Sequence, residues 1–290
     1  MNAAVAPDRY ALMGHPVSHS WSPFIHGLFA RATQQNMQYR LIDVTPERFR
    51  AEALQFFVDG GRGVNVTVPH KLAAAELVNE LTPRAAEAGA VNTIHQKPSG
   101  ELVGDNTDGV GLVTDLEVNL GLTLADRRIL ILGAGGATRG VLGPLLARRP
   151  ALVAIANRTV ARAQKLASQF ARHGILKASG FDSVEAAPFD LVINGTSASL
   201  EGSMPAVTPA AIGADTVCYD MAYAKGDTPF TRYAHERGAR AAYKGWGMLV
   251  EQAAESFLIW RGMRPPTQPV LELLTSSLTH LPETPRGTPP

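Results

Sequence analysis

The chain has 290 residues, of which 45% are hydrophobic and 18% are charged, and its formal net charge is +1. This balance excludes general disorder, and the small net charge gives no reason to expect nucleic acid or a membrane surface as a partner. The length allows two domains, each with its own core. The single cysteine, Cys218, lies in an apolar run and is expected to be a buried structural thiol. Because there is no signal-peptide pattern and no apolar run near the ~20 residues of a membrane span, we expect a cytoplasmic protein.

Strand and helix patterns alternate in the first third of the chain. Strands are predicted at residues 10–13, 39–44, 64–68, 91–95 and 101–104. The last two are expected to form a hairpin around a turn at 98–100. Two helices begin with proline at the first helical position, one after Ser22, which is expected to cap it, and one after Thr45.

The segment GVNVTVPHK, residues 63–71, has an unusual strand pattern. Valines alternate on one face, whereas Asn65 and Thr67 lie on the other. An exposed edge strand would explain such a polar face equally well. However, Pro69 ends the strand and Lys71 begins a helical pattern, and ligands of open α/β sheets bind at the carboxyl ends of strands. Lys71 is therefore placed where a ligand is expected.

The second half of the chain continues the alternation. Strands are predicted at 129–132, 152–156, 191–193 and 217–219, and helices at 109–120, from the turn after 132 to about 148, at 161–171 and at 248–260. Such βαβα alternation predicts two α/β domains with largely parallel sheets. The helix at 248–260 follows the second sheet and is expected to cross back to the first domain.

The strand at 129–132 leads into the turn GAGGAT, residues 133–138, and then into a helix. This is the setting of a dinucleotide-binding turn, because Gly133 permits the tight turn and the next two glycines let the backbone approach a pyrophosphate at the helix N-terminus. Thr138 stands where the usual pattern has a third glycine. A plain turn at a helix start is the simpler alternative.

The residues after the next strand indicate which dinucleotide binds. Sites for NAD usually have an acidic residue there, which binds the ribose hydroxyl. This chain has Arg158 instead, with Arg162 one helical turn further on, and arginine can hold a 2′-phosphate. Between Arg127 and Phe181 there are ten Lys or Arg residues and no acidic residue. A solvated basic face would explain the excess of charge but not its place beside the glycine turn, so NADP is the predicted cofactor.

Polar side chains also gather at the ends of elements in the first domain. Residues 14–23 offer hydroxyls, residues 90–93 an amide and residues 104–109 a carboxylate. Each has a simpler structural role when taken alone: Ser22 could cap a helix and Asp108 could favour a helix dipole. Together they predict a pocket for a small carboxylate that carries several hydroxyls.

The segments GHPVSHSWSP, GVNVTVPHK, AGAVNT, GDNTDGVGL, GAGGATRG, NRT and GWGMLVEQA occur in the order seen in shikimate dehydrogenases. From about residue 10 to residue 265 the chain resembles this family, which reduces 3-dehydroshikimate to shikimate with NADPH on the route to aromatic amino acids. The resemblance implies an oxidoreductase with a small-molecule substrate, no nucleic acid or membrane partner, and a monomer or homodimer. Trp246 and His70 depart from the residues usual in the family, and neither departure is expected to affect a residue with a chemical role.

The resemblance also implies a domain plan. It consists of an N-terminal open, mostly parallel α/β substrate domain at 1–107 and a Rossmann-type NADP-binding domain at 108–245. The C-terminal helices, at 246–290, would return to the substrate domain, with a mobile tail from about residue 281, where the sequence is rich in proline.

The roles of single residues follow from the same resemblance. Lys71 and Asp108 would be catalytic, with Lys71 delivering a proton or stabilising the developing alkoxide while hydride passes between nicotinamide and substrate. Substrate-binding residues would be Ser20 and Ser22 for the carboxylate, Asn65, Thr67, Asn92 and Asp108 for the hydroxyls, and Lys71, Tyr223 and Gln252. Cofactor-binding residues would be Gly133, Ala134, Gly135, Gly136, Ala137, Asn157, Arg158, Thr159, Arg162, Thr196, Met221 and Gly245. The eight histidines show no metal-ligand spacing, and no metal is implied.

Three other readings compete with this one. A relaxed quinate/shikimate dehydrogenase would also use NAD, which Arg158 argues against. A non-catalytic sensor of shikimate-like ligands would not need both Lys71 and Asp108. A folate-pathway dehydrogenase of similar layout is not supported by the serine pair at 20 and 22 or by Asn65 and Thr67.

Overall fold

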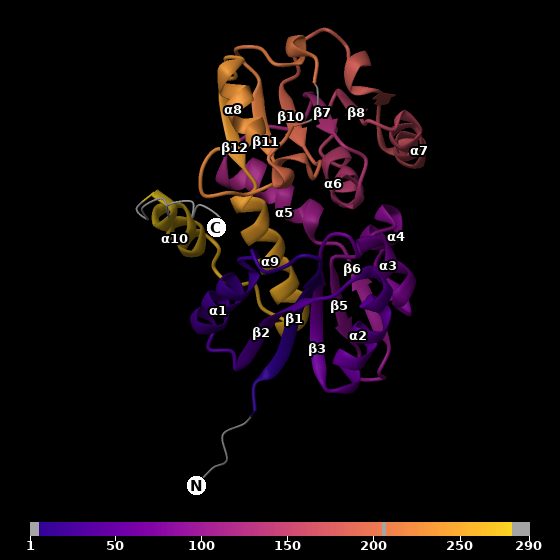
Figure 1. The fold of residues 1–290 in the computed structure, drawn as a ribbon, viewed down its shortest axis with the longest axis vertical. Coiled ribbons are helices and arrows are strands. Elements are labelled where there is room, and N and C mark those ends of the chain that lie inside the picture. The colour runs from indigo at the N-terminus through magenta and orange to yellow at the C-terminus, as the bar shows by residue number, and fades with distance from the viewer. Residues whose placement is uncertain (1–5, 205–206, 280–290) are drawn as a thin grey trace, which may run out of the picture.

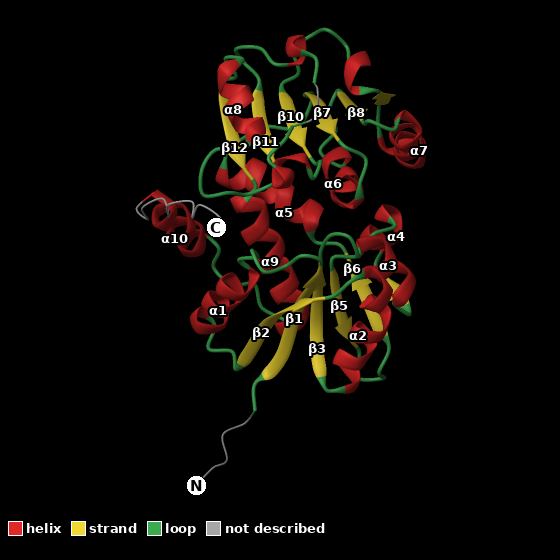
Figure 2. Ribbon diagram, viewed as in Figure 1, coloured by secondary structure: helices red, strands yellow, loops and turns green. Residues whose placement is uncertain are grey.

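The computed structural model describes residues 6–204 and 207–279. Over these ranges the chain forms two lobes, one above the other along the long axis (Figure 1). Each lobe is built on a six-stranded sheet, and helices flank both sheets (Figure 2). The predicted α/β class with two sheets is therefore confirmed. The tail expected from about residue 281 lies outside the described residues.

The first lobe contains the strands β1 (Asp8–Gly14), β2 (Met37–Asp43), β3 (Gly61–Val66), β4 (Glu80–Leu81), β5 (Thr93–Gln96) and β6 (Leu102–Asp105). They lie in the order β2-β1-β3-β5-β6-β4. Strand β1 pairs in parallel with β2 and β3, whereas β5 is antiparallel to β3 and β6, as the predicted hairpin requires. The core of this lobe packs Met13 and Val66 of the sheet near Phe49 and Phe56.

The second lobe contains the strands β7 (Arg128–Leu132), β8 (Leu152–Ala156), β9 (Leu176–Ser179), β10 (Leu191–Asn194), β11 (Val217–Asp220) and β12 (Ala241–Lys244). All neighbours are parallel, in the order β12-β11-β10-β7-β8-β9. The chain runs outward from β7 to β9 and then returns to start β10 on the other side of β7. This is the strand order of dinucleotide-binding sheets, whose ligands bind at the carboxyl end of the strands where the order reverses.

Helices complete both lobes. The first lobe has α1 (Ser22–Ala32), α2 (Pro46–Val58), α3 (Lys71–Leu77) and α4 (Pro83–Ala88), and the second has α5 (Asp108–Thr114), α6 (Gly136–Leu146), α7 (Val160–Phe170) and α8 (Pro229–Glu236). A π-helical turn at Asp115–Asn119 extends α5, and short 3₁₀ turns lie at Ala171–His173, Phe181–Ser183, Ala198–Glu201 and Pro209–Ala211.

Helix α9 (Trp246–Arg261) joins the two lobes. It follows β12 of the second lobe and descends beside the first sheet (Figure 1). At its far end the Trp260 Nε1 donates to the Ile94 carbonyl at 3.1 Å, and Arg261 pairs with Asp8 at 2.5 Å. The helix that comes next, α10 (Gln268–Thr279), falls in the segment 246–290, where the resemblance implied helices but the residue patterns gave no bounds for a second one.

Two glycines bring α9 close to the helical segment that opens the second lobe. A Cβ atom on Gly111 would lie 2.7 Å from the backbone nitrogen of Gln252, and one on Gly247 would overlap the Asp115 carboxylate. A side chain at either position would therefore push the helices apart. The close crossing of α5 and α9 places Gln252 at the junction of the lobes.

Some local predictions were wrong. Helix α1 begins at Ser22 itself, so Trp21 and not Ser22 stands at the cap position, and no side chain caps the helix. The Ser22 backbone N–H donates to the Ser20 hydroxyl at 3.2 Å. Strand β3 ends at Val66, so that Val68, expected on the apolar face, is 54% exposed. Strand β4 was not predicted because two residues are too few to show a period of two.

No helix within residues 6–204 and 207–279 combines the length and apolar character that a membrane crossing needs.

Candidate active site

Lys71, Asp108 and Asn92 form a connected group between the lobes. The Lys71 ammonium donates to Asp108 Oδ2, and the Asn92 amide donates to Asp108 Oδ1 at 2.8 Å. The side chains of Lys71 and Asp108 are 14% and 6% exposed, so their ion pair is only weakly screened by water. Because Asn92 occupies the second carboxylate oxygen, the carboxylate is held in one orientation toward the lysine.

Backbone hydrogen bonds hold these three residues together. Val91 N donates to the Lys71 carbonyl at 2.8 Å, and Asn92 N donates to the Asp105 carbonyl at 3.0 Å. The loop at 90–92 is thus tied both to the start of α3 and to the end of β6, where the segment leading to Asp108 begins. Although Asp108 lies 37 residues after Lys71 in the sequence, these bonds bring the two side chains together.

Asp105 anchors the loop that carries Asp108. Arg84 binds its carboxylate with two hydrogen bonds, of 2.6 and 2.8 Å, and Thr82 adds a third at 2.6 Å. Burial alone would raise the pKa of Asp105, but the hydrogen bonds from Arg84 and Thr82 outweigh it and hold that pKa below its ordinary value. Asp105 therefore stays ionised behind the site.

Asn65 belongs to a buried polar wall that is shared between the first sheet and α9. Its Nδ2 lies 3.2 Å from the Asn92 carbonyl, 3.1 Å from Thr93 Oγ1 and 3.0 Å from Ser256 Oγ. Ser256 in turn lies 2.8 Å from Thr93 Oγ1 and 3.3 Å from Thr107 Oγ1. Burial of so many polar groups is tolerated because each finds a partner. Thr67, just past β3, is half-buried, and its hydroxyl has no partner in the described part of the chain.

The serine pair lies where β1 has ended and α1 begins. The Ser20 hydroxyl donates to Ser22 Oγ at 3.1 Å. The phenol of Tyr223, from the second lobe, lies beside Ser20, and burial raises the pKa of Tyr223 above its ordinary value. Both lobes thus contribute hydroxyls to this end of the site, and all of them are neutral donors at physiological pH.

Two side chains of α9 face the same region. Gln252 Oε1 lies 3.4 Å from both Asn92 Nδ2 and Thr107 Oγ1. Trp246, which was expected to be remote from any role, packs on Tyr223 with ring centroids 4.9 Å apart and meets Trp21 of the first lobe edge-on at 5.8 Å. Trp246, the first residue of α9, thus packs between Tyr223 of the second lobe and Trp21 of the first.

The glycine turn lies opposite Lys71. Gly133 has φ +102°, which only glycine adopts without strain, and a Cβ built on Gly136 would come 3.5 Å from the Lys71 Cβ. The neighbouring Gly135 has open space where a side chain would be. Thr138, in place of the third glycine, is buried and donates to the Gly133 carbonyl at 3.0 Å, so it closes the turn from inside.

Three further cofactor candidates meet beside this turn, at the carboxyl ends of β10, β11 and β12. A Cβ on Gly133 would lie 3.0 Å from Thr196 Cγ2, so the two turns are in contact. A Cβ on Gly245 would lie 2.4 Å from the Met221 carbonyl oxygen, which leaves room only for glycine. The backbone segments that carry these residues are therefore closely packed against one another, at the place where a nicotinamide ring is expected.

Cations without acidic partners in the described part of the chain lie at the other end of the candidate nucleotide site. Five of the ten basic residues between 127 and 181 pair with carboxylates, namely Arg127, Arg128, Arg148, Arg172 and Lys177. Arg158, Arg162 and Lys165 are exposed at the start of α7 and have no acidic partner in the described part of the chain. Asn157 Nδ2 donates to the Thr159 carbonyl at 2.9 Å and stiffens the turn between them. The arrangement suits a phosphate group.

Of the residues that the sequence singled out, the structure joins Lys71, Asp108, Asn92 and Gln252 by hydrogen bonds, and it adds Tyr39, Thr93, Thr107 and Ser256 around them. Ser256 lies one helical turn after Gln252 on α9, a spacing that would have identified it. Tyr39 lies on β2, and its hydrogen bond to Asn65 joins residues 26 apart in sequence, which no local pattern reports.

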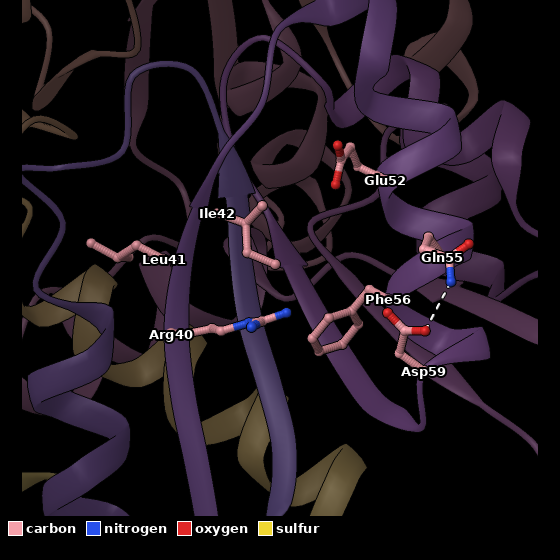
Figure 3. Close-up of a pocket in the computed structure, with 7 residues that line it drawn as sticks. All are labelled: Arg40, Leu41, Ile42, Glu52, Gln55, Phe56 and Asp59. Atoms are coloured by element: carbon pink, nitrogen blue, oxygen red, sulfur yellow. Dashed lines mark hydrogen bonds between the residues drawn. The ribbon is translucent and has the colours of Figure 1, made fainter.

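Two cavities lie outside this site. A pocket of about 240 Å³ lies beside β2 and α2. Figure 3 shows its lining, in which the Arg40 guanidinium lies over the Phe56 ring and Gln55 donates to Asp59. A second hollow, of about 350 Å³, lies between β12 and α10. Neither contains Lys71 or Asp108. In the described ranges no three His, Cys, Asp or Glu side chains are placed to hold a metal ion, and burial raises the pKa of Cys218 to about 12.

Comparisons with protein families agree with this geometry. Residues 12–94 match the family described as "Shikimate dehydrogenase substrate binding domain", residues 116–202 match "Shikimate / quinate 5-dehydrogenase", and residues 245–275 match "Shikimate 5'-dehydrogenase C-terminal domain". Among curated proteins, the shikimate dehydrogenase (NADP(+)) of Aeromonas hydrophila is 54% identical over 271 residues, which are 93% of this chain and 98% of that protein. The enzyme of the same name from Methylococcus capsulatus is 52% identical over 268 residues, which are 92% and 96% of the two chains.

Solved structures are similar over nearly the whole chain. The Ael1 enzyme from Pseudomonas putida has a TM-score of 0.85 and 45% identity, with 92% of this chain and 98% of that chain covered. The shikimate 5-dehydrogenase of Thermus thermophilus, in complex with NADP(H) and shikimate, has a TM-score of 0.82 and 32% identity, with 93% and 99% covered.

Proposed function

The chain belongs to the shikimate dehydrogenase family, and we propose how its own residues carry out the reversible, NADP-dependent conversion of shikimate to 3-dehydroshikimate. It is an oxidoreductase that acts on a CH–OH group in the route to aromatic amino acids. NADP, when bound, supplies the hydride chemistry. The protein residues bind and orient the substrate and move the proton.

Lys71 is the proton-transfer group. Its ammonium has three N–H groups, and one of them donates a hydrogen bond to Asp108. Another can therefore transfer its proton to the substrate oxygen as the ketone becomes an alcohol, and the amine takes the proton back in the reverse direction. Asp108, fixed by Asn92, keeps the ammonium in place and offers its remaining lone pairs to a substrate hydroxyl. The placement of Lys71 at the carboxyl end of β3, facing Gly136, is the observation that carries this proposal.

The substrate carboxylate lies against Ser20 and Ser22, with Tyr223 closing from the second lobe. The ring hydroxyls then face Thr67, Asn65, Asn92 and Gln252. Thr67 supports this orientation because its hydroxyl has no partner among the described residues and is free to accept a ligand.

The nucleotide binds along the carboxyl ends of the strands of the second sheet. Its pyrophosphate lies on residues 133–137 at the N-terminus of α6, where backbone N–H groups are free. Asn157, Thr159, Arg158 and Arg162 hold the adenosine 2′-phosphate, and Thr196, Met221 and Gly245 line the nicotinamide end. The two arginines carry the choice of NADP over NAD because they have no acidic group to pair with among the described residues.

The domain plan follows from these roles. Residues 1–107 form the substrate domain, residues 108–245 the NADP-binding domain, and residues 246–290 the segment that returns to the substrate domain. The small-molecule reaction fits a cytoplasmic monomer or homodimer.

One set of assays tests the proposal. Shikimate and quinate are each oxidised with NADP and with NAD, and kcat/KM is compared for the four pairs. We expect kcat/KM to be higher for shikimate with NADP than for any other pair. A similar kcat/KM for quinate with NAD would instead assign the relaxed quinate/shikimate activity, which one of the matching families includes in its name.

A further inference from the structure

Tyr39 has a place in the site that its sequence context does not reveal. It lies on β2, beside Tyr10 of β1 in the parallel register. Its ring stacks on the buried His26 ring with centroids 4.3 Å apart and planes 8° apart. Burial raises the pKa of Tyr39 well above its ordinary value and lowers the pKa of His26 to about 3. Both rings are therefore neutral at physiological pH, and the phenol keeps its proton as a donor.

The phenol forms a hydrogen bond with the side-chain amide of Asn65. The Tyr39 hydroxyl donates to Asn65 Oδ1 at 2.8 Å. The Nδ2 of the same amide faces three acceptors, the Asn92 carbonyl among them. If the amide turned over, its oxygen would face the Asn92 carbonyl, which can only accept, and the phenol would have to accept from the NH₂ group instead of donating to the oxygen. The Asn92 carbonyl therefore selects this orientation of the amide, and the Tyr39 hydroxyl holds its oxygen from the other side.

The same phenol lies beside the serine pair. The Ser22 hydroxyl interacts with Tyr39, while Ser20 donates to Ser22. The Tyr39 phenol thus lies between Ser22 on one side and Asn65 on the other. Ser20 and Ser22 are the residues that we place on the substrate carboxylate, and Asn65 is one that we place on a ring hydroxyl. One phenol oxygen joins the two ends of the pocket.

We propose that Tyr39 is a positioning residue that determines substrate specificity, because it fixes the Asn65 amide and so sets the spacing between carboxylate and hydroxyl that the pocket accepts. This inference rests on the proposed function of the site. Tyr39 touches neither the reacting carbon nor Lys71, so it acts on the binding of shikimate and not on the chemical step.

The test is Tyr39→Phe, which keeps the ring on His26 and removes only the hydroxyl. We expect KM for shikimate to rise about 5- to 30-fold, the effect of leaving one buried acceptor unpaired, with kcat within about threefold of wild type and KM for NADP unchanged. Tyr10→Phe is the matched control: it removes a hydroxyl from the register partner, whose own contact is Arg261 at 3.2 Å, outside the site. Its KM for shikimate should stay within about twofold of the wild-type value.

A double-mutant cycle separates positioning from general damage. In an Asn65→Ala background the further change Tyr39→Phe should alter KM for shikimate by less than about twofold, because the amide that the phenol holds is gone. An undiminished effect in that background would overturn the inference, as would a Tyr39→Phe variant with wild-type KM or one whose loss lies in kcat. Oxidation of shikimate by the wild-type protein, in the same assay, tests the proposed function separately.

Discussion

Glu87 of α4 and Arg172, just after α7, form an ion pair of 3.0 Å between the two lobes. His173 also reaches the Glu87 carboxylate, at 2.5 Å, and Gln169 donates to the Glu87 carbonyl at 2.5 Å. The start of α7 carries the arginines that we place on the nucleotide phosphate. One helix therefore touches the substrate lobe at one end and the proposed cofactor site at the other.

Glu87→Gln should make the lobes separate more easily. The side chains of Arg172 and Glu87 are 73% and 23% accessible, so the loss of their pair should cost at most about 1 kcal/mol. We expect KM for both shikimate and NADP to rise about two- to fivefold at low salt, and the difference from wild type to vanish at about 1 M salt, where the charges are screened. Steady-state kinetics at two salt concentrations measure this.

The control for that variant is Glu117→Gln. Glu117 pairs with Arg148 at 3.1 Å, entirely within the second lobe, and this pair is also partly exposed. This variant should leave both KM values unchanged. Equal effects of the two substitutions would mean that the pair at Glu87 has no part in lobe closure.

Arg158→Ala should weaken NADP selectively. Hydrogen bonds to a charged group contribute about 1.5–3 kcal/mol, so KM for NADP should rise about ten- to a hundredfold while KM for NAD hardly changes. Arg149→Ala is the matched control, because Arg149 is also exposed and has no acidic partner in the described ranges, but lies at the opposite end of β8. Losses of equal size with both cofactors would remove the 2′-phosphate from the proposed contacts of Arg158.

Arg84→Ala should destabilise the fold in a way that depends on pH. The variant leaves Asp105 buried without its cationic partner, which costs about 3–5 kcal/mol near pH 7. In the wild type the folded-state pKa of Asp105 is lowered, so its contribution is present above about pH 4 and is lost as the pH falls below that value. In the variant burial is unopposed by the arginine and raises this pKa, so protonation relieves the cost. The gap between the two proteins should therefore be largest near neutral pH and shrink toward about pH 4.

Urea unfolding at about pH 7 and about pH 4 measures this gap, with Arg148→Ala as the exposed control, whose loss should stay below about 1 kcal/mol at both values. A gap that is constant with pH would show that Arg84 supports the fold by packing and not through the charge of Asp105.

Local patterns predicted the parts of the site that lie within one continuous segment. The alternation at 63–71 places Asn65 and Lys71 because a period of two assigns faces within a single strand. The glycine turn is recognisable because Gly133, with its positive φ, has to be glycine. Tyr39 and Glu87 could not be found in this way, since their partners, Asn65 and Arg172, lie 26 and 85 residues away in sequence. The cap of α1 was misplaced by one residue: the helix begins at Ser22 itself, so Trp21 stands at the cap position and no side chain caps the helix.

The most direct test of the account is turnover and shikimate affinity measured on one preparation of Lys71→Ala, with its folding checked by melting temperature. Because Lys71 acts on the oxygen that gains or loses a proton, we expect kcat to fall about 10²–10⁴-fold. Shikimate affinity should change far less, since Ser20, Ser22 and Thr67 still hold the ligand. Turnover near that of the wild type, with binding of shikimate largely lost, would contradict the account and make Lys71 an anchor for the substrate instead of its proton donor.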